Sequence, residues 1–144
     1  MRGSRYFKHY IHIVIDTIPM KIFNLILAVL FFLFAVLQLN DDPSDIWFWV
    51  FIYSFVAGVS AFAAFGKYNM WVLLLGFGAV VYQMFLRFPA FAQWIDMGMP
   101  TITGEMKATS PHVESTREFL GLVVCLMVLI FHSVRYSRIR RSVE

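Results

Sequence analysis

The sequence predicts an all-α integral membrane protein, because four long apolar stretches take up about half of the 144-residue chain. Composition agrees: the chain is 60% hydrophobic and 15% charged, with a mean hydropathy of +0.70. Each stretch is close to the ~20 residues that a helix needs to cross ~30 Å of hydrocarbon. We therefore expect a four-helix bundle crossing up-down-up-down, with spans at about 22–39, 46–65, 70–88 and 117–135.

The first 19 residues form a segment of a different kind. Apolar residues such as Ile11 and Ile15 are interleaved with Lys8 and Asp16, so the segment is too short and too charged to span. We predict an amphipathic leader, residues 1–19, lying along the inner interface. Pro19 is expected to separate it from a single transmembrane domain, residues 20–144.

Turn residues define the first two connections. In residues 40–45, Asp42 can serve as an N-cap and Pro43 as the first helical residue, with Asp45 as the third-position acid. Gly66 and Asn69 predict a helix C-cap followed by an N-cap. Both connections are short, so consecutive spans should form antiparallel hairpins.

The third connection, residues 89–116, is longer and is a candidate functional element. Phe91, Trp94 and Ile95 repeat at helical spacing, which predicts a short interfacial helix after Pro89 that ends near Gly98. The pair Ser110–Pro111 should restart a helix that runs into the last span.

Basic residues are distributed unevenly. Nine of the twelve precede the first span, lie between the second and third, or follow the fourth, whereas Asp41, Asp42 and Asp45 make the first connection acidic. The positive-inside rule then places both termini in the cytoplasm and the 40–45 and 89–116 connections outside, across the inner membrane if the source is bacterial. The basic tail is explained by topology and anionic lipid, so no nucleic-acid partner is expected.

Polar residues of the two outward connections are expected to gather above the membrane. Glu114 and Glu118 are four apart and Arg117 is three from Glu114, so the three can share one side of a helix. We call the full set the candidate outer polar cap: Gln38, Asn40, Asp41, Trp47, Trp94, Lys107, His112, Glu114, Arg117 and Glu118. Two interpretations stay open, namely salt bridges and caps that fasten the long connection to the helix ends, or a pocket for a small polar ligand or lipid headgroup.

Metal binding and catalysis have little support. Asp41, His112, Glu114 and Glu118 are suitable ligand types, but His112 and Glu114 are two apart on a helix and point in different directions, and Arg117 would repel a cation. No nucleophile with an adjacent base, phosphate loop or HExxH pattern is present in the sequence. We therefore predict no metal site, no cofactor and no enzymatic activity.

Few polar groups fall within the spans. His132 is expected to snorkel or to bond a neighbouring group rather than to relay protons, and Cys125, the only cysteine, should be a small buried hydrophobe. The absence of ionisable residues near the midplane argues against a channel or pump.

Several separated motifs resemble the transmembrane protein 220 family. They are Leu37-Gln38-Leu39-Asn40-Asp41, Trp47, Tyr53, Pro89, Trp94, Gly98, Pro100, Met106-Lys107, Val113-Glu114 and Arg117-Glu118-Phe119-Leu120-Gly121. The resemblance covers roughly residues 20–135 and implies a small four-helix membrane protein without an established activity. The family's Asn-Asp-Pro-Asp-Pro is here Asn40-Asp41-Asp42-Pro43-Ser44, so its second acid is shifted or replaced.

The leading hypothesis is a non-enzymatic membrane protein that acts as an interaction or accessory subunit. Its expected partners are membrane lipid and either other membrane proteins or further copies of the chain. The alternative is a binder or carrier of a small polar ligand or lipid headgroup that uses the candidate outer polar cap.

Overall fold

Four α-helices make up most of the fold that the structure describes. The computed structural model describes the backbone of residues 3–40, 46–103 and 111–143, and the side chains of residues 18–39, 46–103 and 113–141. The helices are α1 (Gly3–Leu37), α2 (Ile46–Ala64), α3 (Met70–Asp96) and α4 (Pro111–Val143), and a short 3₁₀ turn η1 (Gln38–Asn40) follows α1. All four are long and apolar enough to cross a membrane, which confirms the prediction of an all-α, four-span protein.

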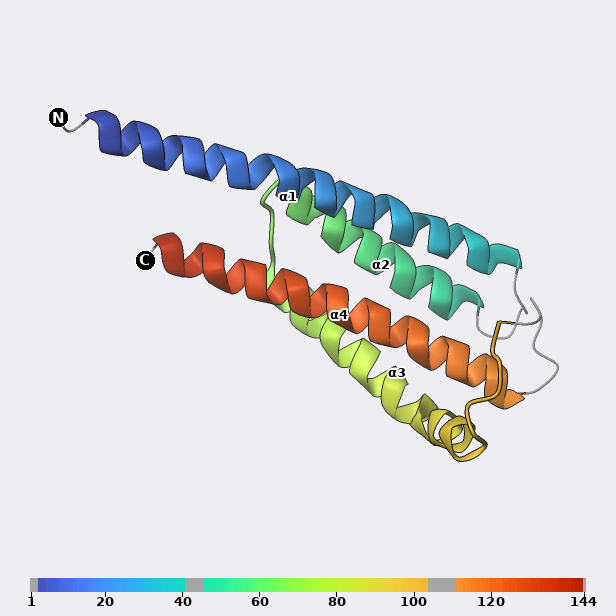
Figure 1. The fold of residues 1–144 in the computed structure, drawn as a ribbon. Helices are drawn as coiled ribbons and strands as arrows, with labels where there is room; N and C mark the ends of the chain where they lie inside the picture. Colours follow the sequence, from blue (N-terminus) through green and yellow to red (C-terminus); the bar gives the residue numbers. More distant parts are fainter. Residues whose placement is uncertain (1–2, 41–45, 104–110, 144) are drawn as a thin grey trace.

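The helices are paired as two hairpins. The closest packing is between α1 and α2 and between α3 and α4, and the hairpins meet where α2 approaches α4 and α3. Both termini and the α2–α3 turn lie toward one end, which we call the terminal end (Figure 1). The ends of α1 and α3 and the beginnings of α2 and α4 lie at the other, which we call the loop end.

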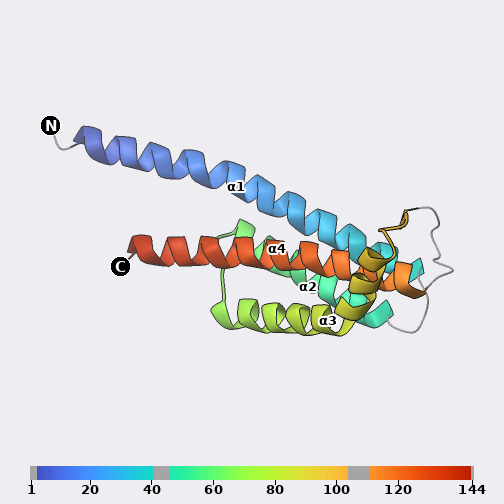
Figure 2. The ribbon, with the colours of Figure 1, turned by 60° about the horizontal axis from the view of Figure 1, so that its bottom comes forward.

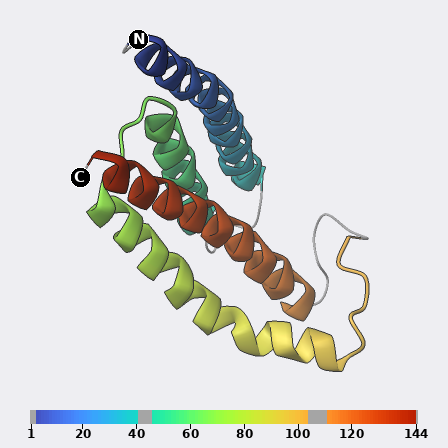
Figure 3. The same ribbon diagram turned by 60° about the vertical axis from the view of Figure 1, so that its left-hand side comes forward.

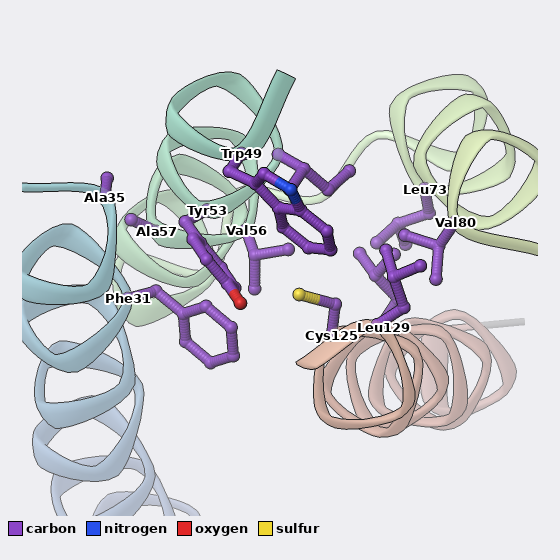
Figure 4. Close-up of a cluster of buried hydrophobic side chains, with 12 residues drawn as sticks. Phe31, Ala35, Trp49, Tyr53, Val56, Ala57, Leu73, Val80, Cys125 and Leu129 are labelled. Atoms are coloured by element: carbon purple, nitrogen blue, oxygen red, sulfur yellow. The ribbon is translucent and has the colours of Figure 1, made fainter. Parts of the chain in front are cut away.

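The core is built where the two hairpins meet. Buried residues of α4 recur at helical spacing, from Leu122 through Cys125 to Leu129, and face Val56 of α2 and Val80 of α3. Figure 4 shows Tyr53 and Cys125 in this core, with Phe31 of α1 at its edge. The buried position of Cys125 agrees with its predicted role as a small hydrophobe. Among the four candidate spans, α2 buries the largest share of its residues, because it packs closely against α1 and also meets α3 and α4.

Two predicted helix boundaries are wrong, and both lie at prolines. Pro19 lies inside α1, which is helical from Gly3, so the leader is not separated from the first span by a break. Pro89 lies inside α3, so the helix predicted after it is the continuation of the third span. A proline removes one backbone hydrogen bond and bends a helix without having to end it. Figures 2 and 3 show the last turns of α3 turning away from its earlier direction.

The turn chemistry between α2 and α3 is confirmed. Gly66 adopts a φ of +70° directly after α2, and the side chain of Asn69 accepts hydrogen bonds from the backbone N–H groups of Trp71 (2.9 Å) and Val72 (3.4 Å). At the far end of α3, Met97 is the C-cap and Gly98 has a φ of +83°. Helix α4 begins at Pro111 as expected. The predicted caps Asp42, Pro43, Asp45 and Ser110 lie outside the described residues.

Candidate functional site

The carboxylate of Glu118 joins three helices at the loop end. Its Oε1 accepts a hydrogen bond from the indole Nε1 of Trp49 at 3.0 Å, and its Oε2 accepts from Nε of Arg87 at 2.8 Å. Trp49 belongs to α2, Arg87 to α3 and Glu118 to α4. We call these residues and Gln83, described next, the Glu118 network.

Arg87 makes further contacts within the Glu118 network. Its Nη1 donates to the side-chain oxygen of Gln83, one turn earlier on α3. Its guanidinium also lies over the rings of Trp49 and Phe48, 5.2 Å and 5.6 Å from their centroids. A delocalised guanidinium is suited to such combined ring and carboxylate contacts.

The network is partly withdrawn from solvent. The side chains of Arg87 and Glu118 retain 15% and 19% of their exposure, and Trp49 retains 4%. Charge-assisted hydrogen bonds are stronger in such surroundings, whereas a partner left alone would carry an uncompensated desolvation cost. The paired arrangement therefore favours one packing of α2, α3 and α4.

The chain after α3 is tied to the helix ends. Nε1 of Trp94 donates to the carbonyl oxygen of Pro100 at 2.9 Å, and Nε of Arg117 donates to the carbonyl oxygen of Ile102. The rings of Phe91 and Phe119 stack with centroids 4.3 Å apart, so the bent end of α3 packs against the beginning of α4. These contacts hold residues 97–103 beside α4.

An aromatic group lies next to the Glu118 network on the side of α1. Tyr53 packs against Trp49 (5.7 Å between ring centroids), Phe34 (5.8 Å) and Phe31 (6.1 Å). A methyl group added at Gly121 would lie 2.6 Å from the Tyr53 hydroxyl oxygen, so the missing side chain lets this hydroxyl approach α4 closely. Gly121 therefore has a packing role.

Those members of the candidate outer polar cap whose side chains the structure describes are distributed over the loop end rather than gathered around one space. Glu118 faces α2 and α3, whereas Glu114, one turn earlier, is exposed and Trp47 is 76% exposed. Arg117 and Trp94 are bonded to backbone carbonyl groups, and Gln38 is half-buried. The side chains of the remaining members lie outside the described residues: Asn40, Asp41, Lys107 and His112.

Sequence reasoning missed three members of the Glu118 network. Trp49, Gln83 and Arg87 are not among the residues of the candidate outer polar cap predicted from sequence. A usable signal was present: Gln83 and Arg87 are four apart near the end of one helix, and Glu118 lies near the start of the next. Opposite charges at the same depth of an antiparallel pair are expected to meet.

A second polar contact lies toward the terminal end. The hydroxyl of Ser60 in α2 and Nε2 of His132 in α4 form a 3.0 Å hydrogen bond between fully buried side chains. This confirms the prediction that His132 bonds a neighbouring group. Among the side chains that the structure describes, no three His, Cys, Asp or Glu residues are grouped as metal ligands would be.

A groove of about 390 Å³ lies between α1, α2 and α4, near the loop end. Its walls are apolar except for Gln38 and the hydroxyl of Tyr53: Leu30, Phe31, Phe34, Leu37, Gln38, Tyr53, Leu120, Gly121 and Val124. The groove is separate from the Glu118 network, whose donors and acceptors face one another.

Most of the chain, including the Glu118 network, is similar to one known protein family. The family model described as "Transmembrane family 220, helix" matches residues 30–134. The chain belongs to this family. The matched region includes the Glu118 network and the motif from Arg117 to Gly121, whose members here fasten residues 97–103 and pack against Phe91 and Tyr53. No curated protein and no solved structure shows significant similarity to the chain.

Proposed function

We propose that this family member is a non-enzymatic accessory or interaction subunit of a membrane, with an ordered polar cap at the loop end as a contact surface. The proposal is supported by the Glu118 carboxylate, because both of its oxygens are occupied by hydrogen bonds from Trp49 and Arg87. A carboxylate held in this way orders a surface and is poorly placed to activate a substrate. The position of Trp47, 76% exposed at the same end, supports a contact with another protein.

The proposal includes an orientation. The loop end faces outward and both termini are cytoplasmic, in a chain that crosses the membrane four times in alternating directions. Support comes from the basic residues of the terminal end, because basic residues are retained on the cytoplasmic side. They include Lys21, Lys67, Arg135, Arg138, Arg140 and Arg141.

Site-directed photo-crosslinking in native membranes tests the contact surface. Benzoylphenylalanine in place of Trp47 should give protein adducts identifiable by mass spectrometry. Trp71 is a matched control, because it is also 76% exposed but lies at the terminal end. Lipid adducts alone at both positions, or the same protein adducts at both, would contradict a contact surface at the loop end.

A second candidate function is a binder or carrier of a small polar ligand or lipid headgroup. It is favoured by the groove between α1, α2 and α4, in which Gln38 and Tyr53 provide polar groups beside apolar walls. Replacing Gln38 by leucine should abolish binding of such a ligand while leaving Trp47 adducts unchanged. An accessory subunit that works only through its surface would show no effect of Gln38→Leu.

A further inference from the structure

A second groove lies between α2 and α3, on the terminal half of the molecule. It has a volume of about 410 Å³, within the range of ~300–1,000 Å³ typical of ligand sites. Helix α2 contributes Ser54, Phe55, Gly58, Val59 and Phe62, and α3 contributes Val72 and Leu73. The turn between the helices closes one end with Lys67, Tyr68 and Asn69. Apart from Ser54 at the far end, the groove is thus apolar along its length, and it is polar at the turn.

The groove exists because α2 and α3, although consecutive in sequence, each pack mainly against another helix and so leave space between them. Helix α2 packs chiefly against α1, and α3 chiefly against α4. The two helices approach where the Phe55 ring lies on Gly76, so closely that a methyl group there would be 2.3 Å from the ring. Toward the terminal end, Gly58 leaves open space, since a methyl group added to it would meet nothing within 4 Å.

The length of the groove fits one leaflet of a bilayer. Phe55 lies nine residues before the end of α2 at Ala64, which corresponds to about 14 Å of helix. Half of a hydrocarbon core is about 15 Å thick. An acyl chain that enters beside Lys67 would therefore reach Phe55 near the middle of the membrane.

Charge distinguishes the polar end of the groove. Lys67 is exposed, and Tyr68 holds the turn in place by packing against His132 and Tyr136 of α4, with ring centroids 6.2 Å away in each case. The acidic residues whose side chains the structure describes all lie at the loop end: Asp96, Glu114 and Glu118. A positive group at the headgroup level attracts anionic lipid.

We propose that the α2–α3 groove is a binding site for an anionic phospholipid. One acyl chain lies along Gly58, Val59 and Phe62 and ends at Phe55, and the phosphate-bearing headgroup pairs with the ammonium group of Lys67. This site is separate from the contact surface at the loop end, so it stands whether or not that surface binds a protein.

Photolabelling of the full chain in proteoliposomes tests the proposal. Two phospholipid probes are compared, phosphatidylglycerol and phosphatidylcholine, each with a diazirine at the end of one acyl chain. Labelling of residues 54–73 is measured by mass spectrometry and normalised to labelling of residues 22–33 of α1. We expect about fivefold more groove labelling with the anionic probe, the effect of one basic side chain beside an anionic headgroup.

Three variants distinguish labelling by a lipid bound in the groove from labelling by the surrounding bilayer. Gly58→Leu should reduce groove labelling several-fold by filling the open space, whereas Gly78→Leu should not, because Gly78 also has nothing within 4 Å but does not line the groove. Lys67→Gln, in an exposed turn, should remove the preference for the anionic probe. Unchanged labelling in Gly58→Leu, an unchanged preference in Lys67→Gln, or crosslinks from the groove to a second protein chain in place of lipid would overturn the proposal.

Discussion

At the scale of single residues, Glu118 shows how neighbouring helices can hold one partly buried charge in place. Both oxygens of its carboxylate accept hydrogen bonds from neighbouring helices, and the guanidinium that compensates its charge also lies over two aromatic rings. A charge in such surroundings is stabilised as long as every partner is present. Removing one partner is therefore costly.

Glu118→Ala should lower the free energy of unfolding by about 2 kcal/mol, because Trp49 and Arg87 lose a charged acceptor in a partly buried place. Glu114→Ala, one turn away and exposed, should change it by less than about 0.5 kcal/mol. Unfolding with increasing sodium dodecyl sulfate in mixed micelles measures both values. Equal losses in the two variants would show that the Glu118 network contributes no special stability.

Gly121 provides a second prediction at this scale. Gly121→Val should destabilise the protein by about 1–3 kcal/mol, because the added side chain would collide with the Tyr53 hydroxyl. Tyr53→Phe removes that oxygen and should recover part of the loss in the double variant. Thermal unfolding of the four proteins in detergent gives the coupling. Strict additivity of the two changes would argue against the collision.

At the scale of helices, the existence and approximate positions of the spans follow from sequence, whereas behaviour at prolines does not. The length of the second apolar stretch predicts the bounds of α2 to within one residue, because a membrane-crossing helix continues for as long as the sequence stays apolar. The sequence predicts helix breaks at Pro19 and Pro89, but both prolines are accommodated within helices. The effect of a proline depends on whether neighbouring groups compensate the lost hydrogen bond, and sequence alone does not specify those neighbours.

The N-cap of α3 is the strongest local signal and carries a prediction of its own. Asn69→Ala should lower the free energy of unfolding by about 1 kcal/mol, because the N–H groups of Trp71 and Val72 lose their side-chain acceptor. Asn69→Asp keeps an acceptor oxygen at the same position and should be nearly neutral. Sodium dodecyl sulfate titrations compare the variants, and a loss of the same size in Asn69→Asp would point to a role of Asn69 other than capping.

At the scale of the whole molecule, the sequence predicts antiparallel hairpins for α1–α2 and for α2–α3, but α2 and α3 are not each other's main packing partners. Short turns determine that α1 pairs with α2 in sequence order, yet α3 pairs with α4 rather than with α2, although the α2–α3 turn is short as well. The choice depends on shape and on polar contacts between distant segments, such as Trp49 with Glu118 and Ser60 with His132. Residue type predicts Glu118 as a site member, but its partners, Trp49 and Arg87, come from two other helices and are set by the tertiary packing.

The orientation of the molecule carries the last prediction. The sole cysteine, Cys125, is fully buried, so a cysteine introduced at an exposed position can be labelled selectively. Thr103→Cys at the loop end and Ser137→Cys at the terminal end both alter exposed residues. In intact cells or right-side-out vesicles, a membrane-impermeant maleimide should modify Thr103→Cys at once and Ser137→Cys only after the membrane is opened.

The two cysteine positions control for each other, and the unsubstituted chain should stay unlabelled throughout. The expected asymmetry follows from nine basic residues on the terminal side against three on the other, which opposes translocation of the terminal end. Labelling of Ser137→Cys in intact cells with Thr103→Cys protected would reverse the orientation. The α2–α3 groove would then open toward the outer leaflet, and the anionic lipid that it binds would have to come from that side of the membrane.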